Sequence, residues 1–189
     1  MRGEASRIAD RESRDLLASK LRDTREDAWR IGNELFVITS LLDGNVRIER
    51  ALTDVSRPLE DKVAVLNTLL GDQVHPMTME IMTEVVKRRW SRAADIANAV
   101  EDFGVDAMMY YADATDSTLQ VSIELAELHS ALLNTPVVRA KLYDETVPSE
   151  ARVKFFHELF DGKGLNKVTM RLAEHLSLIH ISEPTRLGM

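Results

Sequence analysis

The segment that decides the fold is "DVSRPLEDKVAVLNTLLGD", residues 54–72. Pro58 suits the first turn of a helix, where its missing N–H is not needed, and Glu60 and Asp61 favour the positive end of the helix dipole. Gly71 follows the last apolar residue and can adopt the left-handed αL conformation that commonly ends a helix. The segment therefore predicts one amphipathic helix with a defined start and end.

The flanking segments show the same helical spacing. Apolar residues recur at steps of three and four between residues 28 and 42, at Ala28, Ile31, Leu35, Ile38 and Leu42. Similar patterns predict helices over 4–21, over 46–53, from 77 onward and over 92–115, the last capped by Ser91. Aromatic residues make up only 5% of the chain, and good helix formers dominate it. We therefore expect an all-α fold.

A shift of 90 residues places the pattern of residues 54–72 on a second copy. Four residues of the turn and helix, Asp54, Pro58, Glu60 and Lys62, fall on Asp144, Pro148, Glu150 and Arg152. The upstream apolar stripe matches as well, with Ile31, Leu35, Ile38 and Leu42 on Val121, Leu125, Leu128 and Leu132. Glu34 falls on Glu124 by the same shift, and Thr78 falls on Thr169 if one residue is inserted.

Two explanations fit this match. Any two amphipathic helices align to some extent, but helical periodicity does not supply the shared spacing of aspartate, proline, glutamate and base. We favour an internal duplication, with a six-helix unit over 1–115 and a partial second copy over 116–176. The second copy has no counterpart of the helix at 92–115.

Composition and charge exclude several classes of function. With 24 basic and 31 acidic residues the net charge is -7, which disfavours nucleic acid as a partner. The absence of cysteine excludes thiolate catalysis and thiolate metal sites. The N-terminus has no apolar signal region, and no apolar run is long enough for a membrane span. Without a P-loop, GxGxxG, HExxH or GxSxG motif, we expect no catalytic residue, cofactor, metal or small-molecule substrate.

The five histidines are scattered along the chain rather than spaced as metal ligands, at positions His75, His129, His157, His175 and His180. We expect them to be solvated or helix-capping residues. One alternative is a histidine phosphotransfer module that uses His129. However, Ser130, Ala131 and Leu132 follow this histidine in place of a phosphate-binding lysine.

The methionines at positions 77, 79 and 82 allow two interpretations. Methionine adapts to a partner helix, so these side chains could line a groove for an amphipathic peptide. They could equally form part of the core. The residues alone thus predict a helical interaction module without visible chemistry.

The order of these elements resembles the delta subunit of bacterial F-type ATP synthase, the oligomycin-sensitivity-conferring protein family. The resemblance depends on six helices in sequence, on "SRPLEDKVAVLNTLL" and on "MEIMTEVVKRRWSRAADIANAVEDF". It covers residues 1 to about 175, and the duplicated form is similar to the long delta subunits of actinobacteria. It implies that residues 1–115 form a six-helix bundle of the delta N-terminal type.

The resemblance also implies a function. Delta subunits are non-catalytic stator parts that bind alpha subunits of the catalytic head and a b-type peripheral stalk, at the cytoplasmic face of the plasma membrane. In the family, an alpha-subunit helix occupies a groove between the first and fifth helices. The matching residues here are Ile8, Leu16, Met79, Met82 and Val86, each of which could also be core. A free-standing helical adaptor or the phosphotransfer module is the alternative.

The final residues do not fit the family pattern. In "LSLIHISEPTR", residues 176–186, isoleucines and Pro184 bring strand-like and helix-breaking character before any turn signal. This peptide resembles a translated transposon-end sequencing adapter. We therefore expect residues 177–189 not to be native and the natural protein to be longer.

Overall fold

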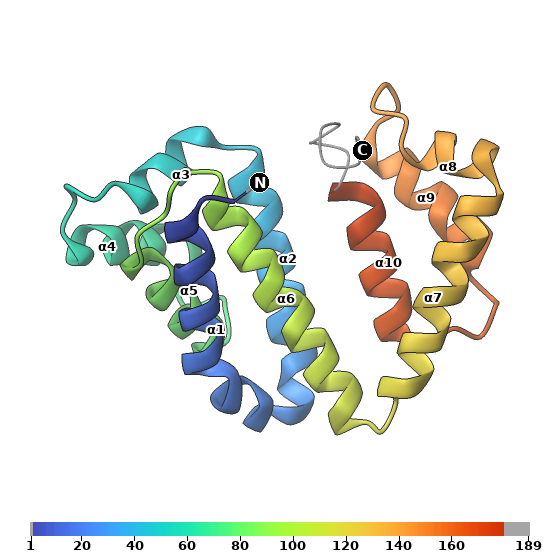
Figure 1. Ribbon diagram of the computed structural model, residues 1–189, viewed down its shortest axis with the longest axis horizontal. Helices are drawn as coiled ribbons and strands as arrows, with labels where there is room; N and C mark the ends of the chain where they lie inside the picture. The colour runs from blue at the N-terminus through green and yellow to red at the C-terminus, as the bar shows by residue number, and fades with distance from the viewer. Residues whose placement is uncertain (1, 180–189) are drawn as a thin grey trace. The chain divides into compact units, whose positions relative to one another are not determined.

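The computed structural model describes residues 2–179 (Figure 1), and within this range its only regular elements are helices. This confirms the all-α prediction. The α-helices are α1 (Glu4–Asp23), α2 (Ala28–Asp43), α3 (Val46–Thr53), α4 (Leu59–Leu70), α5 (Pro76–Lys87), α6 (Asp95–Ala114), α7 (Thr118–Asn134), α8 (Pro136–Leu142), α9 (Ser149–Phe160) and α10 (Lys167–Ile179). A short 3₁₀ turn, η1 (Arg25–Asp27), precedes α2.

The chain divides into two compact units, residues 1–111 and residues 112–189. The division falls within α6. Each unit has its own set of buried residues.

The core of the first unit is built around α5, which contacts α1, α2 and α4. Five apolar side chains of α5 are buried: Met77, Ile81, Met82, Val85 and Val86. A close contact between α2 and α6 completes the core. A Cβ at Gly104 of α6 would lie 2.6 Å from Cε1 of the buried Phe36 on α2. Only glycine therefore allows this helix crossing without movement of the ring.

The observed start of α6 and the observed end of α4 can be compared with the sequence-based prediction. The last helix of the first unit begins at Asp95, not at residue 92, and Ser91 is not its cap. Instead, the Ser91 N–H donates to the Ser6 hydroxyl at 2.7 Å, and the Trp90 indole donates to the Val85 carbonyl at 2.9 Å. These contacts with α1 and α5 hold the segment out of the helix. Gly71 does end α4, with a positive φ of 53°, but its ψ of -141° lies outside the predicted αL region.

The second unit buries the apolar side chains that follow the helical spacing of the first. They are Val121 and Leu128 on α7, Leu142 on α8, Phe156 on α9, and Val168 and Leu172 on α10. Helix α10 packs against α7 and α9, as α5 packs against α2 and α4.

The predicted tail lies largely outside the described residues. Residues 177–179 continue α10, whereas residues 180–189, with His180 and Pro184, are not described. No helix within residues 2–179 combines the length and the apolar character that a membrane span requires.

Candidate functional site

The surface predicted to bind a partner lies where α1 packs on α5. Two ion pairs cross this contact, one between Lys20 and Glu80 and one between Arg88 and Glu12 at 2.6 Å. Exposed pairs of this kind stabilise a structure by at most about 1 kcal/mol each. Their main effect is to fix the register of the two helices.

The five predicted groove residues divide into two sets. Ile8 and Leu16 are 40% and 57% exposed on α1, and Met79 on α5 is partly buried against the core. Met82 and Val86 are fully buried. In this structure these two are core residues, the alternative left open for them, and partner binding by the five residues stays a prediction. Helical periodicity identified their stripe but could not show that α1 and the rest of the core cover it.

Helix α1 is held by a polar network that periodicity did not predict. The Arg2 guanidinium lies 3.1 Å from the Asp10 carboxylate and 2.6 Å from that of Asp102 on α6. Arg14 forms a second pair with Asp106 of α6 at 2.7 Å. Since two of these acids come from α6, the network fixes the position of α1, and with it the exposed side chains of Ile8 and Leu16.

Asp10 is the least satisfied member of this network. It is 9% exposed, and its Oδ1 has no hydrogen-bond partner among the described residues. Burial, together with the nearby charge of Asp102, raises the pKa of Asp10 from 3.8 to about 6. The carboxylate form is thus destabilised in the folded chain.

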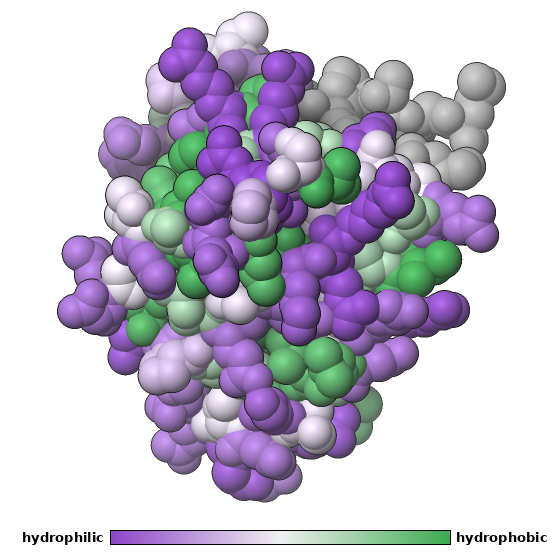
Figure 2. Space-filling model, turned by 90° about the vertical axis from the view of Figure 1, so that its left-hand side faces the viewer, coloured by the Kyte–Doolittle hydropathy of each residue, from purple (hydrophilic) through white to green (hydrophobic). Residues whose placement is uncertain are grey.

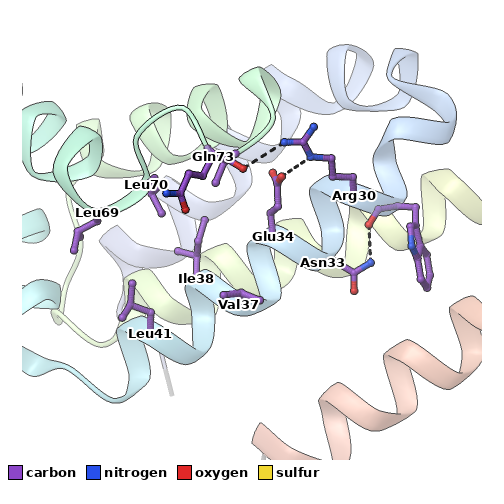
Figure 3. Close-up of a pocket in the computed structure, with 11 residues that line it drawn as sticks. Arg30, Asn33, Glu34, Val37, Ile38, Leu41, Leu69, Leu70 and Gln73 are labelled. Atoms are coloured by element: carbon purple, nitrogen blue, oxygen red, sulfur yellow. Dashed lines mark hydrogen bonds and ion pairs between the residues drawn. The ribbon is translucent and has the colours of Figure 1, made fainter.

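A groove with a cavity volume of about 580 Å³ lies between α2 and the segment that ends α4 (Figure 3). Its exposed apolar rim consists of Val37, Leu41 and Leu69. This groove was not predicted from the sequence, because Val37 and Leu41 lie off the buried stripe of α2 and the facing residues come from a later segment. The available signal was the presence of apolar residues at these off-stripe positions.

Glu34 lies at one end of this groove and ties α2 to the start of α5. Its Oε2 accepts hydrogen bonds from the His75 N–H at 2.9 Å and the Thr78 hydroxyl at 2.6 Å. Its Oε1 pairs with Arg30 at 2.7 Å (Figure 3). The carboxylate thus satisfies groups at the N-terminus of α5, which also carries the positive end of the helix dipole.

The second unit repeats this arrangement. Oε2 of Glu124 accepts hydrogen bonds from the Asn166 N–H at 3.0 Å and from the Thr169 hydroxyl. The residue that caps the helix is also equivalent: Nδ1 of His75 accepts from the Met77 N–H at 3.0 Å. In the second unit, Oδ1 of Asn166 accepts from the Val168 N–H at 2.8 Å.

The turns before α4 and α9 match in the same way. Oδ1 of Asp54 accepts from the Ser56 N–H at 2.9 Å and from its hydroxyl at 2.7 Å. Oδ1 of Asp144 accepts from the Thr146 N–H at 2.9 Å and from its hydroxyl at 2.6 Å. These bonds are local, and each carboxylate holds its turn ahead of the following helix.

The histidines show no shared site. His75 caps α5, as expected for a capping histidine. His129 is exposed on α7. His157 on α9 lies 3.0 Å from both Asp161 and Glu174. The hydrogen bond to Asp161 raises the pKa of His157, with Glu174 acting in the same direction against the effect of burial. Within residues 2–179, no group of three side chains is placed to hold a metal ion.

Comparison with known proteins adds a sequence relationship to this geometry. No protein-family model matches the chain. The chain is 81% identical over 175 residues to ATP synthase subunit delta of Bifidobacterium longum strain DJO10A, a match that covers 93% of this chain and 63% of the relative. It is 72% identical over 175 residues to the subunit delta of Bifidobacterium adolescentis, covering 93% of this chain and 64% of that protein.

A more distant relative extends the match. The subunit delta of Streptomyces avermitilis is 31% identical over 172 residues, covering 91% of this chain and 63% of that protein. The chain thus spans somewhat less than two thirds of the length of these curated relatives. The resemblance to delta subunits that the sequence predicted is confirmed.

Proposed function

Because the chain resembles ATP synthase delta subunits over 93% of its length, we propose that it acts as a non-catalytic stator subunit of an F-type ATP synthase. In this role it links the catalytic head to the membrane sector at the cytoplasmic face of the membrane, so that rotor torque drives ATP synthesis. Its partners are alpha subunits and, in the whole protein, a b-type stalk subunit. The 81% identity is the observation that carries this proposal.

We further propose that residues 1–115 are a delta-type six-helix bundle and that residues 116–176 are a partial second copy of it. The matched hydrogen bonds of Glu34 and Glu124, and of Asp54 and Asp144, support this duplication. Chance alignment of amphipathic helices would match apolar stripes, but it would not reproduce these polar contacts at the same spacing.

The α1–α5 surface is the proposed contact for the N-terminal helix of an alpha subunit. Ile8 and Leu16 supply exposed apolar side chains, Met79 contributes a partly buried one, and the two ion pairs border them. A buried apolar anchor surrounded by polar groups is the usual organisation of a helix-binding surface.

The test is the affinity of a synthetic alpha-subunit N-terminal peptide for the 189-residue chain, measured by isothermal titration calorimetry. We expect Leu16→Lys to weaken binding by roughly tenfold or more, as for a central interface residue. Val37→Lys is the matched control, because Val37 is similarly exposed at 66% but lines the α2 groove. The proposal fails if the peptide does not bind, or if Val37→Lys weakens binding while Leu16→Lys does not.

A further inference from the structure

A pocket of about 320 Å³ lies between the α3–α4 loop and the C-terminal end of α5 in the first unit. Five basic side chains line it: Arg57, Lys62, Lys87, Arg88 and Arg89. We call it the basic pocket. Such a concentration of cations contrasts with the net charge of -7 of the chain. On the side of the molecule that carries α4, hydrophilic side chains surround small hydrophobic areas (Figure 2).

The central cation of the basic pocket is buried. Lys62 is 6% exposed, and its Nζ donates to the Val86 carbonyl at 3.3 Å. Within the described part of the chain no carboxylate forms an ion pair with it. An ammonium group has three donors, and a buried charge usually has a partner of opposite sign. Lys62 therefore has further N–H donors in a buried position, where unsatisfied donors are energetically unfavourable.

The electrostatic surroundings of Lys62 agree with this. Burial lowers the pKa of Lys62, the Asp54 carboxylate opposes this effect, and the Arg57 charge adds to it. Oδ1 of Asp54 accepts hydrogen bonds from the Ser56 N–H and hydroxyl. The pocket thus holds a desolvated cation beside a second cation, and Asp54 is the acid that opposes the effect of burial on Lys62.

Two of the other cations are already neutralised. Arg88 pairs with Glu84 and Glu12, each at 2.6 Å, and Lys87 lies 3.7 Å from Glu84. Arg57 and Arg89 are exposed and form no ion pair with any residue between 2 and 179. Three cations of the basic pocket are therefore available to an added anion.

The second unit provides an independent instance of the same feature. Arg152 falls on Lys62 in the 90-residue shift and is likewise buried, at 9% exposed. Its Nε and Nη1 have no hydrogen-bond partner among the described residues. Both units thus have a buried cation with unsatisfied hydrogen-bonding capacity in the first turn of the equivalent helix, α4 in the first unit and α9 in the second. A role for Lys62 solely in capping α5 would not account for the two Arg152 nitrogens that lack a hydrogen-bond partner among the described residues.

We propose that the basic pocket binds a small oxyanion, a phosphate or a carboxylate, through Lys62, Arg57 and Arg89. Such groups are the strongest hydrogen-bond acceptors for ammonium and guanidinium donors. A phosphate is small enough for a cavity of this volume. The exposed arginines would complete the contacts that the buried lysine begins.

The test is nuclear magnetic resonance titration of the ¹⁵N-labelled 189-residue chain with inorganic phosphate and, separately, with acetate, at constant ionic strength set by chloride. We expect saturable shifts of the backbone amides of residues 55–62 and 86–89. Saturation by phosphate alone would identify a phosphate site, and saturation by acetate as well would identify a general oxyanion site.

Variants decide whether the named cations are responsible. Arg57→Gln should weaken binding roughly tenfold, the effect of one lost hydrogen bond to a charged group. Arg47→Gln, an exposed arginine that does not line the pocket, should leave the affinity unchanged. Lys62→Met should abolish saturation, and its amide spectrum reports whether the variant is folded. The proposal is overturned if neither anion gives saturable shifts at these amides, or if Arg57→Gln and Arg47→Gln bind equally well.

Discussion

Replacement of Asp10 by asparagine should stabilise the chain at neutral pH and not at acidic pH. The carboxylate is buried, one of its oxygens has no partner among the described residues, and its pKa is raised from 3.8 to about 6. A rise of this size corresponds to about 3 kcal/mol of preference for the protonated form in the folded state.

The sign of the pH dependence follows from proton binding. Between pH 3.8 and 6 the folded state binds more protons at Asp10 than the unfolded state does. The free energy of unfolding therefore falls as the pH rises through this range. Above pH 6 Asp10 is ionised in both the folded and the unfolded state, so its contribution to the free energy of unfolding no longer changes with pH. Asparagine has no such titration, and it keeps an oxygen that can accept from Arg2.

The assay is urea unfolding of the wild-type chain and of Asp10→Asn, followed by circular dichroism at several pH values from 4 to 8. We expect the two chains to be about equally stable near pH 4. At pH 8 the variant should be more stable, by up to about 3 kcal/mol. Asp15→Asn, at an exposed position on the same helix, is the control for the loss of one carboxylate from α1. A stability difference between Asp10→Asn and wild type that is the same at pH 4 and pH 8 would refute this reasoning.

Two further predictions concern packing and a histidine. Gly104→Ala should lower the free energy of unfolding by about 1–3 kcal/mol, because its Cβ would overlap the Phe36 ring. Gly44→Ala is the control and should be nearly neutral, because the nearest atom to its Cβ is 3.6 Å away. Equal urea midpoints for the two variants would contradict the described crossing of α2 and α6. The raised pKa of His157 implies a stabilising contribution that is full below pH 6.5 and is lost as the pH rises through its folded-state pKa. His157→Gln should therefore reduce stability at pH 5.5 and not at pH 8.5, as measured by urea unfolding, and a loss of equal size at both pH values would exclude this charge effect.

The fold class could be predicted because its signals are local. The proline, acidic residues and glycine of residues 54–72 act on their own segment of backbone, so the helix they predict is found at Leu59–Leu70. The resemblance to delta subunits was also accessible, because the order and spacing of such segments is a property of the chain alone. It is confirmed by relatives that are 81% and 72% identical to this chain.

The start of α6 and the candidate surface were less predictable. Residues 92–94 have helical spacing, but the contacts of Trp90 and Ser91 with α5 and α1 keep the chain from entering the helix until Asp95. Those contacts join residues up to 85 positions apart. Propensity within a local window cannot detect them.

The sequence by itself determined that this chain is helical, that its helices lie at these approximate positions and that it resembles delta subunits. Only the tertiary structure decided which apolar residues are available to a partner. Met82 and Leu16 are both apolar positions on predicted helices, yet Met82 is fully buried and Leu16 is 57% exposed. Periodicity defines one face of a helix, but whether that face meets solvent depends on which other helices cover it, and that is set by contacts between distant parts of the chain.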